Sequence, residues 1–98
     1  MNKKTSIYFI ENSFDYNAND LNSNKIGGSE KTLINISNEL GKDQKFIIKV
    51  FNNTSNSAII NNVEWNNINE INSSDKADYI IAMSDANLFE KISSKNNF

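Results

Sequence analysis

Two adjacent glycines, Gly27 and Gly28, are the residues of this sequence best placed to bind a ligand, because a helical pattern begins directly after them. Glycine has no Cβ, so a backbone of two glycines lets a ligand approach closely. The first turn of a helix directs free N–H groups and a positive dipole end at the same place, which favours phosphate or carboxylate. Ser29 is suited to cap this helix, and Glu30 brings a favourable negative charge to its first turn. An anion site and a plain turn before a helix are both open interpretations.

The known phosphate motifs do not fit this segment. A P-loop needs two glycines at fixed spacing before Lys31-Thr32, but Lys25 and Glu30 occupy those positions. The dinucleotide-binding fingerprint needs its glycines straight after the first strand, whereas Gly27 comes much later.

Carboxylates near the ends of apolar runs are the second set of candidates. Glu11 and Asp15 follow the first run, where paired carboxylates could do acid–base work, but we expect them to be solvated loop charges. Asp75, Asp78 and Asp85 flank a later run. We expect Asp78 to start a strand and Asp85 to cap a helix, with magnesium binding by Asp85 as the alternative.

Trp65 has an expected structural role. We expect its side chain to be partly buried packing, and the alternative is that it lines a ligand cleft.

Composition excludes several kinds of chemistry. The chain of 98 residues has no His and no Cys, which argues against zinc sites and against serine–histidine or cysteine–histidine nucleophiles. A net charge of −2 without basic clusters argues against nucleic-acid binding. No apolar run reaches the roughly 20 residues of a membrane helix, so we expect a cytoplasmic protein. We predict no metal, no cofactor and no catalytic residue.

The elements that must position these residues follow from apolar patterning. Continuous apolar runs at residues 5–10, 46–51 and 77–83 predict buried parallel strands. Leu33, Ile36 and Leu40 predict one apolar helix face, and Gly41 should end that helix.

The remaining segments are shorter. Residues 11–26 predict a long polar loop, residues 58–60 and 63–65 one or two short strands around a turn, and residues 68–74 a brief helical turn. A second helix should begin at Ser84 or Asp85, with no closing element after it. This alternation predicts an α/β fold with a parallel sheet and flanking helices.

The order of these segments resembles the N-terminal portion of group 1 glycosyltransferases with the GT-B fold. The resemblance rests on Gly-Gly-Ser-Glu at 27–30, Asn-Glu-Leu-Gly-Lys at 38–42, Ile-Lys-Val-Phe-Asn at 48–52, Asn-Val-Glu-Trp at 62–65 and Ala-Asp-Tyr-Ile-Ile-Ala at 77–82. It covers nearly the whole chain. Asn62 stands where the family often has glycine, and the long loop lacks a proline often found there.

The resemblance implies transfer of a sugar from a nucleotide-sugar donor to an acceptor, in cell-envelope polysaccharide synthesis. It implies that Gly27, Gly28, Ser29 and Glu30 face the cleft near the donor diphosphate, without a metal. It also implies that residues 1–98 are a Rossmann-like sub-domain, the incomplete N-terminal half of a GT-B protein whose C-terminal donor domain is absent here.

Such a piece should be inactive alone. The next strand should begin near Phe98, which would leave an unpaired sheet edge and an uncovered apolar face that favour self-association. The full enzyme would associate peripherally with a membrane. The alternative is a stand-alone small α/β binding or signalling domain of flavodoxin-like type.

Overall fold

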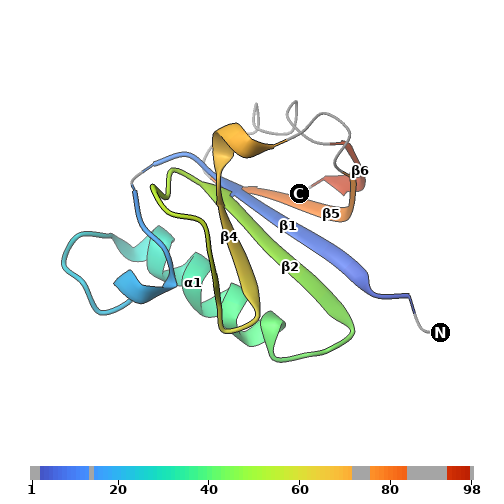
Figure 1. Cartoon of the computed structure of the whole chain (residues 1–98), viewed down its shortest axis with the longest axis horizontal. Coiled ribbons are helices and arrows are strands. Elements are labelled where there is room, and N and C mark those ends of the chain that lie inside the picture. The colour runs from blue at the N-terminus through green and yellow to red at the C-terminus, as the bar shows by residue number, and fades with distance from the viewer. Residues whose placement is uncertain (1–2, 14, 72–75, 84–92, 98) are drawn as a thin grey trace.

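The chain forms one mixed β-sheet with a helix packed on it (Figure 1). The computed structural model describes residues 3–13, 15–71, 76–83 and 93–97, the last range through its backbone. The elements are β1 (Thr5–Glu11), η1 (Ala18–Asp20), α1 (Gly28–Gly41), β2 (Phe46–Asn52), β3 (Ala58–Ile60), β4 (Val63–Asn67), η2 (Ile68–Glu70), β5 (Lys76–Met83) and β6 (Ser93–Asn97).

The sheet has six strands in the order β3-β4-β2-β1-β5-β6. All neighbouring strands run parallel except β3, which pairs antiparallel with β4. Counted along the chain, the parallel strands therefore lie in the order 3-2-1-4-5, as in doubly wound dinucleotide-binding sheets, and differently from the flavodoxin-like order 2-1-3-4-5. The expected α/β fold with a mostly parallel sheet is confirmed, and its strand order is compatible with a Rossmann-like fold.

The three continuous apolar runs form the central strands, as predicted. β1 lies between β2 and β5, and Phe9 and Ile10 in β1 are almost completely buried. Parallel strands covered on both faces need such continuous apolar sequence. Asn61 and Asn62 join β3 to β4 as a tight hairpin, with φ angles of 53° and 64° that asparagine tolerates better than most residues. The brief helical turn predicted after β4 is η2.

The helix prediction is correct in position and partly wrong in detail. α1 buries Leu33 and Ile34, whereas Ile36 is 43% exposed, so the apolar face is rotated from the predicted one. Gly27, and not Ser29, is the N-cap residue. Gly41 is the last helical residue, and a Cβ there would lie 2.7 Å from the backbone oxygen of Asn61. The glycine is therefore required by packing against the β3–β4 turn.

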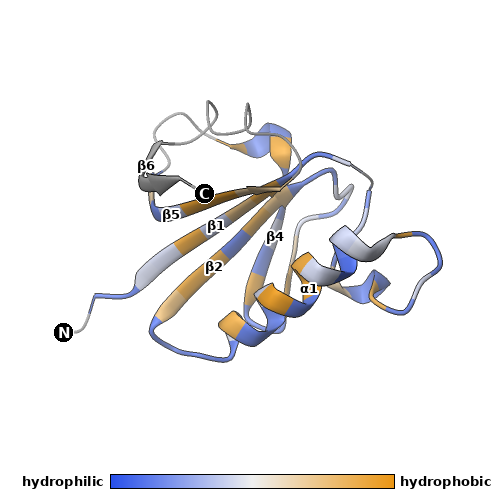
Figure 2. Cartoon of the chain, turned by 180° about the vertical axis from the view of Figure 1, so that it is seen from behind, coloured by the Kyte–Doolittle hydropathy of each residue, from blue (hydrophilic) through white to orange (hydrophobic). Residues whose placement is uncertain are grey.

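Two apolar clusters fill the two faces of the sheet, and Figure 2 shows the apolar residues along the middle strands and one side of α1. The α1-side cluster contains Phe9, Leu33 and Trp65, together with Tyr16 and Ile26 from the loop between β1 and α1. The opposite cluster contains Tyr8, Phe51 and Ile80, with Ile68 of η2. The loop that was predicted only as polar thus contributes three buried side chains to the core, those of Tyr16, Ala18 and Ile26.

The C-terminal prediction needs a correction. β6 begins at Ser93 and pairs parallel with β5, so the next strand starts before Phe98 and β5 is not an edge strand. The helix expected from Ser84 or Asp85, with Leu88, Phe89 and Ile92, lies outside the described residues. No helix in the described part of the chain is long and apolar enough to span a membrane.

Candidate functional site

The candidate site lies where the strand order reverses, at the carboxyl ends of β1 and β5. Glu11, the last residue of β1, pairs in register with Met83, the last residue of β5. Open parallel sheets bind their ligands in the crevice outside such a switch point. Residues 12–27 leave this end of β1, and α1 then runs back along the sheet, so the N-terminus of α1 lies at the same end (Figure 1).

Glu11 is buried at the switch point, with 2% of the residue exposed. Its Oε1 accepts hydrogen bonds from the hydroxyl of Ser13 at 2.7 Å and from the hydroxyl of Tyr16 at 2.8 Å. The expectation that Glu11 is a solvated loop charge is therefore wrong. The physical reason is that the loop folds back over the end of β1 and supplies two donors to the carboxylate.

Tyr16 holds the middle of this loop against the sheet. Its ring is buried and meets the ring of Trp65 edge-on at 5.9 Å between centroids. The side-chain amide of Asn52, at the end of β2, donates to the backbone oxygen of Tyr16 at 2.9 Å. Burial, followed by the hydrogen bond to Glu11, raises the pKa of the Tyr16 phenol, so the hydroxyl stays protonated and remains a donor.

Further hydrogen bonds tie the loop to the segment after β2. The backbone N–H of Ser55 donates to Asp15 at 2.9 Å, and this bond is the main reason that the pKa of Asp15 lies below its ordinary value. The amide of Asn53 donates to Asn12 and to the backbone oxygen of Ser13. Asp15 is exposed, as expected, but it has its own partner and forms no acid–base pair with Glu11 in the described contacts.

The Gly27–Glu30 segment begins α1 and is capped from within. Oε1 of Glu30 accepts the backbone N–H of Gly27 at 2.9 Å, and Glu30 is only 8% exposed. A Cβ on Gly27 would lie 3.3 Å from this oxygen, a tight contact that the Glu30 side chain would have to relieve by shifting. Gly28 and Ser29 are exposed. The N–H groups of the first helical residues have no partner inside the helix.

Gly28 differs from the other two glycines. A Cβ at this position would meet nothing within 4 Å, and no glycine has a positive φ angle. Neither packing nor backbone conformation therefore requires glycine at position 28. The space above it is open.

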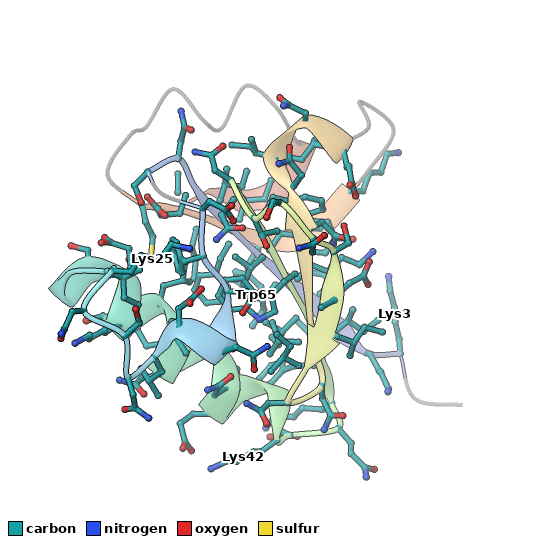
Figure 3. The ribbon with its side chains drawn as sticks, turned by 60° about the vertical axis from the view of Figure 1, so that its left-hand side comes forward. Lys3, Lys25, Lys42 and Trp65 are labelled. Atoms are coloured by element: carbon teal, nitrogen blue, oxygen red, sulfur yellow. The ribbon has the colours of Figure 1, made fainter. Side chains whose placement is uncertain are left out.

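The charges around Tyr16 are acidic. The negative charge of Glu30 also contributes to raising the Tyr16 pKa, so the carboxylates of Glu11 and Glu30 both act on this hydroxyl. The four ion pairs between described residues involve neither carboxylate. Lys3, Lys25 and Lys42 lie far apart from one another in Figure 3. The site thus offers two kinds of group to a ligand: the carboxylates of Glu11 and Glu30 as acceptors, and the first backbone N–H groups of α1 as donors.

The remaining candidates do not join this site. Trp65 is completely buried in the core (Figure 3), so it packs and does not line a cleft. Asp78 is the third residue of β5, and it accepts from the backbone N–H of Ser6 at 2.9 Å. Asp75 and Asp85 lie outside the described residues. Across the part of the chain that is described, no three Asp or Glu side chains gather as a metal site.

A hollow of about 390 Å³ lies at the opposite end of the sheet, lined by residues that include Phe46, Ile47 and Ile59. Phe46 is the first residue of β2, so this hollow marks the amino ends of the strands. Because parallel sheets bind ligands at their carboxyl ends, we assign the site to the switch point.

Sequence reasoning missed Tyr16 and Asn52. Tyr16 had one available signal, since an aromatic residue in a segment of Asn, Asp and Ser indicates an anchor to the core. Asn52 follows an apolar strand directly, which places it at the functional end of a parallel sheet.

Comparison with protein-family models, with curated proteins and with solved structures finds no match to this chain.

Proposed function

We propose that the chain is the N-terminal half of a GT-B glycosyltransferase that moves a sugar from a nucleotide-sugar donor to an acceptor. Gly27, Gly28, Ser29 and Glu30, at the start of α1, form the segment that faces the donor diphosphate. The strand order 3-2-1-4-5 and the position of this loop at the carboxyl end of the sheet support the proposal.

The observation that carries the proposal is the open space at Gly28. The fold itself would accept a side chain there, because a Cβ meets nothing within 4 Å and the φ angle is not positive. A ligand that binds close to the backbone would clash with a side chain at position 28. A diphosphate above the first turn of α1 accounts for glycine at a position where the fold does not need it.

The electrostatics define how the diphosphate is held. Glu30 occupies the N–H of Gly27, so the following N–H groups of the helix are the donors that reach a phosphate oxygen. These donors are fixed by the helix and stabilise charge that develops on the leaving diphosphate. The negative charges of Glu11 and Glu30 repel an anion placed beside them. The phosphate therefore binds on the Gly28 side of the segment.

The acceptor, the peripheral membrane association and the cell-envelope pathway belong to the same proposal. Self-association of the isolated chain is supported by the exposed edge strand β3, on which Ile59 is 76% exposed. The alternative of a stand-alone binding or signalling domain has less support, because its flavodoxin-like strand order is not the one observed.

The experiment is a calorimetric titration of the 98-residue chain with UDP, GDP and ADP. At least one nucleoside diphosphate should bind, and Gly28→Leu, which fills the open space, should weaken that binding at least tenfold. Asn35→Leu adds the same side chain at an exposed position of α1 and should bind as the wild type does. Equal binding by wild type and Gly28→Leu, or no binding of any of the three, contradicts the proposal.

A further inference from the structure

The strand β3 is an edge of the sheet, and within the described residues it pairs with β4 alone. The turn of Asn61 and Asn62 has two residues, so Ile60 and Val63 on either side of it exchange hydrogen bonds. In an antiparallel pair, positions that exchange hydrogen bonds alternate with positions that do not. The N–H and C=O groups of Ile59 therefore point away from β4, toward the outside of the sheet.

The side chain of Ile59 is exposed at the same position. It is 76% exposed, the largest value among the described large apolar side chains. Its neighbours Ala58 and Ile60 are half-buried. Among the described contacts, the backbone groups of Ile59 have no partner. One residue thus presents a donor, an acceptor and an apolar surface together.

The edge lacks the charged and proline residues that usually protect edge strands from pairing. Residues 58–62 carry no charge, and the sequence contains no proline. The carboxylate opposite Ile59 is Glu64, which is paired with Lys49 at 3.6 Å. Each copy of the chain has a net charge of −2, but two copies can approach along this edge without bringing unpaired like charges together.

A second copy of β3 offers the groups that the first one lacks. In an antiparallel pair centred on Ile59, the N–H of each Ile59 donates to the C=O of the other. Residues directly opposite each other project to the same face, so the two Ile59 side chains also contact each other. The contact uses the same residues on both copies. It therefore closes as a dimer and does not extend into a filament.

We propose that two copies of this chain pair through β3 about a two-fold axis at Ile59, which joins their sheets into one continuous sheet. The inference goes beyond the proposed function, and it gives self-association a defined geometry. β4 and β2 separate β3 from β1, so the pairing does not involve the switch point.

The size of this interface sets its strength. Stable complexes bury roughly 800 Å² on each partner, and an edge strand of three residues supplies less than this. The dimer is therefore weak and forms in proportion to protein concentration. The pairing has to be measured on concentrated protein.

The experiment uses the 98-residue chain from micromolar to millimolar concentration. Sedimentation should show a mass that rises from one copy toward two and then stops. Hydrogen exchange followed by NMR should show that the Ile59 amide becomes slower to exchange as the concentration rises. The Ile60 amide, which is bonded within each copy, should exchange equally at all concentrations.

The test variant is Ile59→Lys, which sets two like charges opposite each other across the axis. It should raise the dissociation constant of the dimer by about tenfold or more. Ile36→Lys makes the same change of charge at an isoleucine of α1 that is 43% exposed, and it should dimerise as the wild type does. The exchange of the Ile59 amide in the wild type tests the pairing without any variant.

Three results would overturn the pairing. They are a single copy at every concentration, equal association of wild type and Ile59→Lys, and a mass that grows beyond two copies. Ile59→Lys should bind nucleoside diphosphates as the wild type does. A failure of the dimer therefore leaves the proposed function standing, and a failure of nucleotide binding leaves the dimer standing.

Discussion

The hydroxyl of Tyr16 donates a 2.8 Å hydrogen bond to Oε1 of Glu11, and this contact joins the middle of the β1–α1 loop to the end of β1. Both residues are buried, with exposures of 1% and 2%. Asn52 holds the backbone of Tyr16 from the neighbouring strand. The loop that leads to Gly27 and Gly28 is thereby fixed on the sheet by buried polar contacts.

The first prediction concerns the strength of this anchor. Tyr16→Phe preserves the ring against Trp65 but removes a donor from a buried carboxylate. We expect the free energy of unfolding to fall by about 1.5–3 kcal/mol, the range for hydrogen bonds to charged groups. Urea denaturation measures it. Ser13→Ala removes the other donor at an exposed residue and should cost less. Equal stability of wild type and Tyr16→Phe would show that this hydrogen bond does not stabilise the fold.

The second prediction is a pH dependence at the alkaline end. The folded chain raises the Tyr16 pKa above its ordinary value of 10.0, so above this pH the unfolded state loses a proton that the folded state keeps. The stabilisation from Tyr16 is therefore complete below pH 10 and decreases as the pH rises through the interval above it, by up to about 1.4 kcal/mol per pH unit.

Tyr16→Phe is the control for this dependence, because every other titrating group remains. The stability difference between wild type and Tyr16→Phe should be constant between pH 7 and 9 and should shrink above pH 10. Circular dichroism in urea at several pH values measures it. A difference that stays constant up to pH 11 would contradict the assigned direction of the pKa.

The strands were predictable because each apolar run is longer and more continuous than its surroundings. Ile7 to Ile10 are buried on both faces, and in the second run Ile48, Val50 and Phe51 are buried, whereas Ile47 is 42% exposed. This burial is the physical cause of the pattern that identified the two runs. The helix face was predicted less well. Ile36 fits the helical period of the apolar residues but is exposed, while Ser37 is completely buried. The reason is that α1 packs on β2 and β4, and residue spacing alone does not determine which side of the helix meets these strands.

The role of Glu11 could not be predicted from the sequence. Its donors come from Ser13 and Tyr16, and whether a loop folds back over a strand end depends on tertiary contacts such as the Asn52 amide. For Gly27 and Gly28 the position at the start of a helix was predictable. The distinction between them was not, because it depends on the Glu30 oxygen beside one and the open space above the other.

The third prediction uses the contrast between two glycines. Gly28→Ala adds a Cβ that meets nothing, and it should leave stability within about 0.5 kcal/mol of the wild type or raise it slightly. Gly41→Ala places a Cβ 2.7 Å from Asn61 O and 2.9 Å from Cγ2 of Val63, and overpacking of this kind should cost about 1–3 kcal/mol. Thermal unfolding of both variants measures the contrast. Equal stability of both would show that α1 does not pack on the β3–β4 turn as described.

The fourth prediction concerns that turn. Asn62 has a φ angle of 64°, which glycine adopts freely and β-branched residues resist. Asn62→Gly should therefore be neutral or slightly stabilising, and Asn62→Val should cost about 1–2 kcal/mol. Chemical denaturation of the two variants measures the difference. A valine variant as stable as the glycine variant would contradict the left-handed conformation of this turn.

The central claim is that the first turn of α1 binds a nucleoside diphosphate over Gly28. The most direct measurement is the nitrogen-15 NMR spectrum of the 98-residue chain titrated with UDP, GDP and ADP. The account predicts saturable shifts of the Gly28, Ser29 and Glu30 amides, with small changes at Gly41, and their loss in Gly28→Leu. Amides at 28–30 that do not move with any of the three nucleotides, or that move equally in Gly28→Leu, would contradict it.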